Sequence, residues 1–321
     1  MTVVSFASVK GAPGVTTLTC LVGASWPEGR RVMVAECDPS GGDLAARFCL
    51  SGRRGWSTFA TASRRAGSAA PIEAHLQQLP GGLDVLVGSA EVDGSGPTSP
   101  VDQLLDGIPS PSEGGWDVLA DLGRMVPGHA GGDRWLERSD VVAVLVRGDA
   151  SSVFHVRGLA DRLRSRCGAR AVLVVVEGGL HGPREIEAFT GLPVAGTVPF
   201  DPAAASVASG CQGSARRLSR SALAASARSL AASLSNGSGL SEPAVTGVAG
   251  RARSRRIRAM LAARTKGVAG DVPRGDPPAP PAPPAPEAPT ATPGHVPSFG
   301  AGDAISGPHP SSTVSGGGVL R

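Results

Sequence analysis

Short apolar runs alternate along most of the chain with longer segments whose apolar residues recur at helical spacing. Several runs are apolar at consecutive positions and rich in Val, which is typical of parallel strands buried on both faces. The runs predict strands at 3–6, 31–36, 82–87, 116–121, 139–147, 170–177 and 193–199. The periodic segments predict helices at 16–24, 42–48, 56–66, 71–79, 101–105, 150–166, 183–190 and 214–234. Such alternation predicts an α/β fold with a doubly wound, mostly parallel sheet flanked by helices.

The alternating pattern stops near residue 235, where the composition changes. Asn236-Gly-Ser-Gly239 has the composition of a linker, and from residue 273 onward the sequence is rich first in Pro and Ala, then in Gly and Ser. Such compositions form polyproline-like spacers and flexible segments rather than a packed core. We therefore expect one folded domain over residues 1–235, a linker with a basic segment over 236–272, and a Pro/Gly-rich disordered tail over 273–321.

The positive charge of the chain is concentrated near its C-terminus. The whole chain has 31 Lys and Arg against 27 Asp and Glu, and residues 251–321 hold nine of the former and four of the latter. The stretch Arg251–Lys266 has seven basic residues and no acid, with Ile257, Met260 and Leu261 at helical spacing. This stretch is a candidate for binding an anionic membrane surface or DNA. The alternative is a solvated linker that is helical only in part.

Cysteine spacing and hydropathy exclude several classes of protein. The five cysteines are odd in number and show no C-x-x-C spacing, so we expect reduced thiols rather than a disulfide or zinc framework. No stretch reaches the roughly 18 consecutive apolar residues of a membrane span, and the sequence opens without a secretory signal pattern. No G-x-G-x-x-G follows the first apolar run, which argues against a dinucleotide-dependent oxidoreductase. A cytoplasmic location is expected, with peripheral association with membrane or nucleoid as an option.

The segment between the first predicted strand and the first predicted helix has the features of a phosphate-binding turn. Glycine and proline turn the chain there and leave backbone N–H groups free, and the following helix directs the positive end of its dipole to the same place. Two threonines on the first helical turn offer hydroxyls to a phosphate-bound Mg²⁺ and to a phosphate oxygen. The candidate nucleotide-binding residues are Gly11, Ala12, Pro13, Gly14, Val15, Thr16 and Thr17, and Thr16 is also a candidate Mg²⁺ ligand. The alternative is an ordinary turn between strand and helix.

Two acids follow predicted strands and therefore belong at the same edge of a parallel sheet. Asp38 lies in a Cys-Asp-Pro-Ser-Gly-Gly stretch after the second strand, and Asp121 ends the fourth, with Gly123 two residues beyond. The carboxyl ends of parallel strands face the crevice in which doubly wound sheets bind ligands. Asp121 is a candidate to hold Mg²⁺ through a water, and Gly123 would let a backbone N–H approach a terminal phosphate. Residues 124–134 are expected to form a loop, and for Asp38 the alternative is a solvated turn.

The order Lys10-Gly-x-x-Gly-x-Thr-Thr17, followed by these two acidic segments, resembles the motifs of the MinD/ParA family. That family comprises SIMIBI-class P-loop ATPases with a deviant Walker A motif. The resemblance covers about residues 2–235 and implies ATP and Mg²⁺ as ligands and a homodimer that sandwiches the nucleotide. It also implies that Lys10 reaches across the dimer to the partner's nucleotide and that Asp38 orients or activates the attacking water. Lys10 and Asp38 are therefore the candidate catalytic residues.

Three positions depart from the pattern of that family. Val15 stands where the family has the lysine that grips the β- and γ-phosphates. Glu36 replaces the first Asp of an Asp-x-Asp-Pro segment, and Glu177 stands where the family has an Asn that reads adenine. Loss of a charge-assisted phosphate contact costs on the order of a few kcal/mol in a site shielded from water. We therefore expect weak or absent ATP hydrolysis.

Two functions are compatible with these residues. The first is a dimeric nucleotide-dependent switch, as in proteins that position chromosomes, septa, or secretion and pilus machinery, acting with a protein partner that the sequence does not identify. The second is an interaction protein that keeps the fold without turnover, similar to the TadZ/CpaE proteins that mark sites of pilus assembly.

Overall fold

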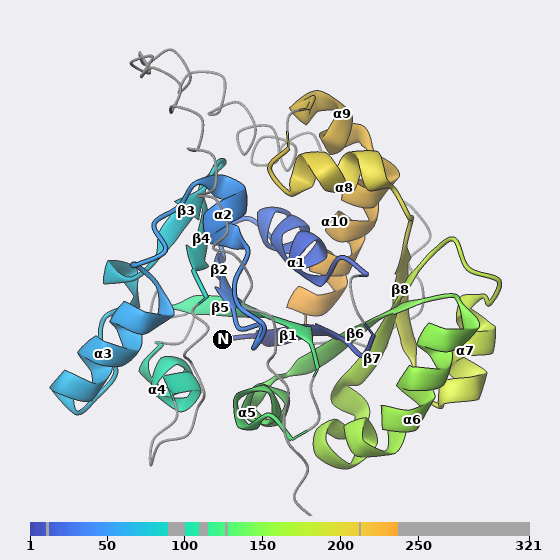
Figure 1. Cartoon of the computed structure of the whole chain (residues 1–321), viewed down its shortest axis with the longest axis horizontal. Helices are drawn as coiled ribbons and strands as arrows, with labels where there is room; N and C mark the ends of the chain where they lie inside the picture. The colour runs from blue at the N-terminus through green and yellow to red at the C-terminus, as the bar shows by residue number, and fades with distance from the viewer. Residues whose placement is uncertain (11–12, 89–99, 109–114, 126–127, 212, 237–321) are drawn as a thin grey trace, which may run out of the picture. The chain divides into compact units, whose positions relative to one another are not determined.

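The computed structural model describes residues 1–10, 13–88, 100–108, 115–125, 128–211 and 213–236. The predicted linker beyond residue 236, the basic segment and the tail lie outside these ranges. The described residues build an α/β fold on one eight-stranded sheet (Figure 1). Its strands are β1 (Val3–Ser8), β2 (Arg31–Glu36), β3 (Gln77–Leu79), β4 (Leu83–Leu86), β5 (Trp116–Arg124), β6 (Val141–Arg147), β7 (Ala171–Val176) and β8 (Val194–Val198).

The sheet is doubly wound around β1. The strand order is β3-β4-β2-β5-β1-β6-β7-β8, and every neighbouring pair is parallel except β3 with β4. The chain leaves β1 toward β2 on one side and later adds β6, β7 and β8 on the other. The predicted fold class is thereby confirmed. In such a sheet the crevice for a ligand lies at the carboxyl ends of the strands beside this reversal, which here are β1 and its neighbours β5 and β6, with β2 next to β5.

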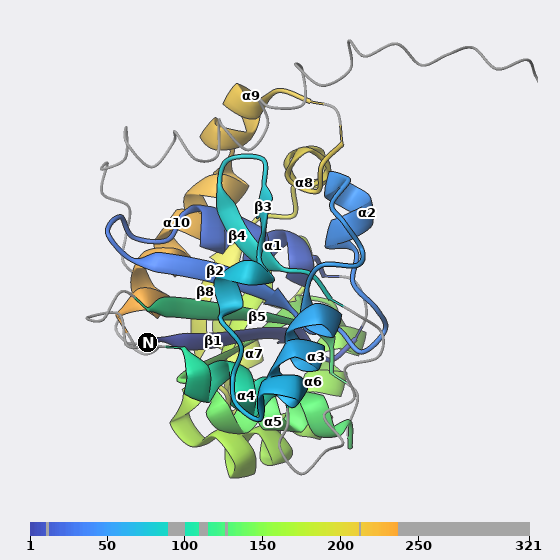
Figure 2. The same ribbon diagram turned by 90° about the vertical axis from the view of Figure 1, so that its left-hand side faces the viewer.

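Helices cover both faces of the sheet. They are α1 (Val15–Ala24), α2 (Leu44–Phe48), α3 (Trp56–Ala66), α4 (Pro100–Gly107), α5 (Ala130–Arg138), α6 (Ala150–Cys167), α7 (Pro183–Thr190), α8 (Pro202–Ala208), α9 (Ala215–Arg220) and α10 (Ala222–Ser235). Helices α1, α2 and α8 to α10 pack on one face, and α3 to α7 pack on the other (Figure 1, Figure 2). Among the described residues, no helix combines the length and the apolar character needed to cross a membrane.

Two apolar cores lie between these layers, one on each face of the sheet. Along β2 the side chains alternate between them, so Val34 joins the core under α1 while Met33 joins the core under α3 to α7. Both are fully buried. This two-sided burial explains why the central strands are apolar at consecutive positions.

The helix predicted at 71–79 is wrong, because this segment forms an edge hairpin. One short 3₁₀ turn, η1 (Ile72–Ala74), precedes β3, which runs antiparallel to β4 through a turn at Pro80-Gly81-Gly82. Proline before a periodic apolar segment is compatible with a helix start. Here the two glycines favour the tight turn, and Leu79 pairs with Leu83 across it.

Two further boundaries differ from the predictions. The single helix predicted at 214–234 is interrupted at Ser221, which ends α9 and caps α10 by accepting a hydrogen bond from the Ala224 N–H at 3.2 Å. The loop predicted at 124–134 stops at residue 129, because α5 begins at Ala130 with the His129 side chain as its cap. Both errors come from capping side chains, which set helix ends locally.

Candidate functional site

Helix α1 is the element that follows the central strand β1 along the chain, and its N-terminus lies at the carboxyl edge of the sheet (Figure 1). Gly14 precedes the helix with a φ of 90° and offers no side chain to cap the first amides, and no acid lies in the first turn. A helix N-terminus without a capping side chain leaves its N–H groups for an anion. Of the predicted loop, Gly11 and Ala12 lie outside the described residues.

Val15 and Thr17 both make contacts inside the protein. Val15, the first residue of α1, is 5% exposed and belongs to the apolar core under this helix. Its side chain therefore stabilises packing and presents no charge to a phosphate, so only its backbone N–H is left for the predicted contact. The Thr17 hydroxyl shares a hydrogen bond of 2.9 Å with the Ser209 hydroxyl, just after α8. A phosphate contact by Thr17 stays a prediction.

Thr16 on α1 and Asp121 on β5 face each other at the start of this helix. Asp121 is fully buried, and its Oδ1 accepts a hydrogen bond from the backbone N–H of Gly123 at 3.0 Å. Its Oδ2 has no hydrogen-bond partner among the described residues. The Thr16 hydroxyl is near enough to lower the pKa of this carboxyl. An unpartnered, buried carboxylate oxygen suits a cation or an ordered water.

Burial dominates the electrostatics of Asp121. It raises the pKa of this carboxyl from 3.8 to about 6, and the charges of Glu36 and Asp38 add smaller contributions in the same direction. Thr16 and the N–H of Gly123 act in the opposite direction. A divalent cation at this carboxylate would reverse the balance, because it favours the ionised form.

Asp38 lies against Gly123, so the loop after β2 meets the end of β5. A Cβ placed on Gly123 would lie only 1.7 Å from Asp38 Oδ2. The loop is also held from within, because Asp38 Oδ1 accepts a hydrogen bond from the Ser40 N–H at 2.7 Å. The N–H of Cys37 donates to the Asp121 carbonyl at 2.7 Å. The structure thus fixes Asp38 beside the residues predicted to hold Mg²⁺.

Lys10 contacts the N-terminus of a different helix of its own chain. Its exposed ammonium donates to Ser151 Oγ at 2.5 Å, in the first turn of α6. Asp149 caps the same helix, and its pKa is lowered mainly by the hydrogen bond from the Ser152 N–H and in part by the Lys10 charge. The predicted role of Lys10 in a second subunit is therefore not visible in this contact, which lies within one chain.

Several contacts of the site were not predicted from the sequence. Glu36 is buried and accepts hydrogen bonds from backbone N–H groups of Asp43, Leu44 and Gly88. The sequence feature that could have indicated these contacts is an acid at the end of a buried strand, next to a glycine-rich loop. Ser151 and Ser209 carry no such signal, since their partners lie 141 and 192 residues away in the sequence.

The few oxygen donors around Asp121 suit a magnesium ion that keeps waters and phosphate oxygens as its other ligands. Among the described residues, no group of three or more His, Cys, Asp or Glu side chains is arranged to hold a metal. Mg²⁺ commonly binds through one or two carboxylates together with phosphate oxygens and waters. The Asp121 carboxylate and the Thr16 hydroxyl are the groups that would hold it here.

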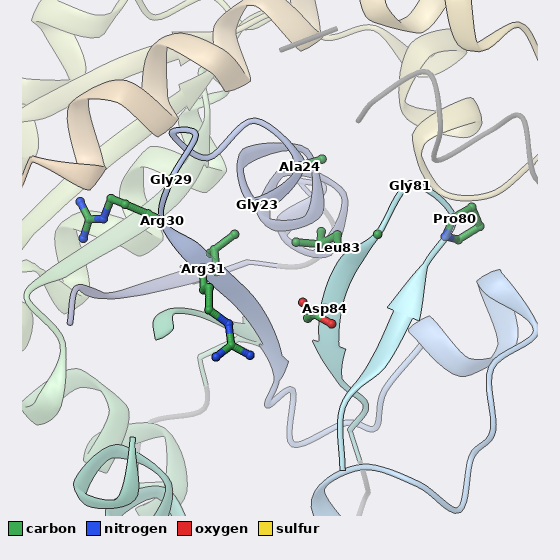
Figure 3. Close-up of a pocket in the computed structure, with 11 residues that line it drawn as sticks. Gly23, Ala24, Gly29, Arg30, Arg31, Pro80, Gly81, Leu83 and Asp84 are labelled. Carbon is green, nitrogen blue, oxygen red and sulfur yellow. The ribbon is translucent and has the colours of Figure 1, made fainter. Parts of the chain in front are cut away.

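A hollow at the other end of the sheet is distinct from this site. It has a volume of about 270 Å³ and lies at the amino ends of β2 and β4 beside the last turn of α1, lined in part by Gly23, Arg30, Gly81 and Leu83 (Figure 3). The Arg30 side chain points away from Gly81 and pairs with Asp117 at 2.7 Å. Two more charged residues, Arg31 and Asp84, line the hollow, and they too have partners, in Glu73 at 3.5 Å and Gln78 at 3.0 Å.

Comparisons with known proteins agree on the fold. No protein-family model matches the sequence. No curated protein matches it either. Among solved structures, the MinD cell division protein of Aquifex aeolicus is similar, with 18% identity, a TM-score of 0.57, and coverage of 76% of this chain and 99% of that one. A ParA-family ATPase of Chlorobium tepidum has 16% identity and a TM-score of 0.60, with coverage of 72% and 98%.

A third similar structure contains a nucleotide. It is the septum site-determining protein MinD of Pyrococcus horikoshii complexed with Mg-ADP, with 15% identity, a TM-score of 0.54, and coverage of 72% of this chain and 94% of that one. At these identities the likeness concerns the fold. The chain therefore has the P-loop ATPase fold of MinD and ParA-family proteins, as its sequence motifs predict.

Proposed function

We propose that this protein binds Mg²⁺-ATP at the N-terminus of α1 and works as a dimeric, nucleotide-dependent switch. The observation that carries the proposal is the buried carboxylate beside Thr16, that of Asp121, whose Oδ2 lacks a partner among the described residues. Two features of the surroundings support it, namely the uncapped start of α1 and the placement of Asp38 against Gly123. The Mg-ADP in the P. horikoshii relative agrees with this choice of ligand.

Each group has a role in this proposal. Backbone N–H groups at the start of α1 would hold phosphate oxygens, and bound Mg²⁺ would neutralise phosphate charge. Thr16 and Asp121 would hold the metal, and the N–H of Gly123 would face the terminal phosphate. Asp38 would orient or activate the attacking water, as in the family that the motifs resemble.

An ATP titration with and without Mg²⁺, paired with a turnover assay, tests this function. Because the buried Asp121 carboxylate would repel phosphate unless a cation lies between them, ATP binding should require Mg²⁺. Absence of Mg²⁺-dependent ATP binding by the full chain would remove the proposed function. Because Val15 supplies no charge, turnover should be slow.

A second candidate function is an interaction protein that keeps the fold without turnover. Two observations favour it: Val15 lies in the core, and Lys10 is held by Ser151 of its own chain. ATP binding without measurable hydrolysis, at protein concentrations high enough to dimerise, would select this function over the switch.

The process that such a switch serves is also part of the proposal. Septum positioning agrees with the names of similar structures, which include a septum site-determining protein and a MinC:MinD cell division complex of Aquifex aeolicus. Chromosome partitioning and the positioning of secretion or pilus machinery rest on the sequence motifs alone. A cytoplasmic switch of this kind needs a protein partner and a surface. We assign the surface contact to the basic stretch Arg251–Lys266, through anionic lipid or DNA.

Deletion of residues 249–321 tests the surface contact. The deletion removes the excess positive charge, so it should weaken sedimentation with anionic liposomes or retention on DNA, and added salt should have the same effect. Equal binding by the full and shortened chains at low salt would contradict it.

A further inference from the structure

Glu36 is the last residue of β2, and its side chain is buried among backbone N–H groups. It is only 2% exposed, although it carries a carboxylate. Oε1 accepts hydrogen bonds from the N–H groups of Asp43 at 2.6 Å and Leu44 at 2.9 Å, and Oε2 accepts one from the N–H of Gly88 at 2.9 Å. Backbone N–H groups that donate to a buried carboxylate supply the hydrogen-bond partners that water would otherwise provide.

These bonds close the loop that carries Asp38. The loop comprises residues 37–43, from the residue after Glu36 to the start of α2. The Glu36 carboxylate accepts its hydrogen bonds at the second end of this loop, from Asp43 and Leu44. Within this loop the Gly41 N–H donates to the Asp38 carbonyl at 3.0 Å, which forms a turn. The bond to Gly88 fastens the same carboxylate to the chain just beyond β4. One side chain thus joins the loop, the start of α2 and the neighbouring strand.

Two glycines show how closely the backbone wraps around this carboxylate. A Cβ on Gly42 would lie 2.3 Å from Glu36 Oε2, and a Cβ on Gly88 would lie 3.1 Å from Glu36 Cγ. Only a residue without a side chain fits at Gly42 while Glu36 keeps its position. An aspartate at position 36 would be one methylene shorter and would not span the same three donors.

We propose that Glu36 is a positioning residue that clamps the Asp38 loop closed and holds Asp38 against Gly123. The clamp itself follows from the contacts within this chain. Its consequence for hydrolysis rests on the proposed function, because Asp38 is the residue assigned there to the attacking water. The three hydrogen bonds to its carboxylate come from backbone N–H groups, and its direct effect on the site is the small rise that its charge adds to the pKa of Asp121.

Amide hydrogen exchange of the nucleotide-free full chain, followed at single residues, tests the clamp. In Glu36→Gln an amide N–H replaces one acceptor, so the amides of Asp43, Leu44 or Gly88 should exchange about tenfold faster or more, with α1 and β5 unchanged. Gly42→Ala leaves Glu36 intact but displaces its carboxylate, so it should speed exchange at the same amides. This second variant replaces Glu36→Gln in the test if the latter fails to fold. Glu28→Gln, at an exposed glutamate, is the matched control.

Turnover kinetics test what the clamp does for Asp38. We expect Glu36→Gln to lower kcat about tenfold or more, with KM nearly unchanged, because misplacing a catalytic group affects the chemical step more than substrate binding. Wild-type exchange rates at all three amides in both variants would overturn the clamp. Faster exchange with an unchanged kcat would overturn the positioning role. Failure of the wild-type chain to bind Mg²⁺-ATP would instead remove the proposed function, and the exchange result would still decide the clamp.

Discussion

At the scale of single residues, Gly123 joins the two acidic segments of the site. Its φ of 54° lies in the left-handed region that favours glycine, and its α-carbon faces the Asp38 carboxylate. Any side chain at this position would push Asp38 and its loop away from β5. The glycine is therefore explained by the contact between the end of β5 and the loop that carries Asp38, in addition to the approach of a phosphate that the sequence suggests.

Gly123→Ala should lower the free energy of unfolding by about 1–3 kcal/mol, because it combines backbone strain with a clash against Asp38. Denaturant unfolding measures this change. Gly158→Ala is the control, since an added Cβ there meets nothing within 4 Å in the middle of α6. The control should be neutral or stabilising by up to about 1 kcal/mol. Equal stability of the two variants would contradict the contact between Asp38 and Gly123.

Asp121 makes the stability of the nucleotide-free protein depend on pH. Burial raises its pKa in the fold to about 6, so the folded chain binds this proton more tightly than the unfolded chain. Stability should therefore fall as pH rises from about 4 to about 6 and should not change further above that range on account of this group. A variant without the Asp121 carboxylate should not show this fall in stability with rising pH.

Asp121→Asn tests that sign. Without nucleotide or Mg²⁺, the variant should be more stable than the wild type at pH 7.5 by about 1–3 kcal/mol, and the difference should vanish near pH 4. Urea unfolding at the two pH values measures it. A stability difference that is the same at both pH values would show that burial of the ionised group is not its cause.

The order of motifs along the sequence was enough to predict which residues belong to the site, but not which contacts they make. Thr16, Asp38, Asp121 and Gly123 follow strands or start helices at one edge of a parallel sheet, and the fold brings them together for that reason. The burial of Glu36 among backbone N–H groups depends on where Gly88 lies in space, which no local pattern encodes. Such contacts between distant segments are the part that required the structure.

At the scale of secondary structure elements, local signals predicted the central elements well and the peripheral ones less well. The buried strands are apolar at consecutive positions, and β6 and β7 are also rich in Val, a pattern that is typical of central parallel strands. The wrong helix at 71–79 is a short edge hairpin, where Pro71 gave a misleading helix start and the glycine pair at 81–82 was the stronger signal. Likewise, apolar spacing continues through Ser221, where one serine stops a helix and starts another.

Ser221→Ala should destabilise the fold by about 1 kcal/mol, because the hydroxyl caps α10 and also donates to the Leu218 carbonyl at 2.7 Å. Thermal or denaturant unfolding measures the effect. Ser229→Ala is a matched control within α10, where the serine is exposed and alanine is the better helix former. If both variants have the stability of the wild type, the interruption at Ser221 does not depend on its hydroxyl.

At the scale of the whole molecule, the proposed dimer requires Lys10 to leave its present partner. In this chain Lys10 donates a hydrogen bond to Ser151, so in the proposed dimer the second subunit must offer a more favourable site, which a bound nucleotide phosphate would provide. The extent of the folded domain, 1–235, and the disordered tail stay predictions, since the residues beyond 236 lie outside the described part of the chain.

Nucleotide affinity should therefore rise with protein concentration. Lys10→Ala should abolish that dependence, because it removes the charge that dimerisation delivers, whereas Ser151→Ala should preserve or strengthen it by releasing Lys10. Fluorescent-nucleotide titrations at several protein concentrations, alongside light scattering, measure both. Unchanged dimerisation and affinity in Lys10→Ala would count against the trans-lysine mechanism and favour the interaction protein.

The central claim is that Thr16 and Asp121 hold Mg²⁺ for a nucleotide at the start of α1. The most direct measurement compares ATP affinity with and without Mg²⁺ in the wild type, in Thr16→Val, and in Thr61→Val as an isosteric control on α3. We predict that Mg²⁺ tightens binding about tenfold or more in the wild type and the control. Thr16→Val, still folded, should lose most of this gain. A Mg²⁺ effect of the same size in Thr16→Val would contradict the account.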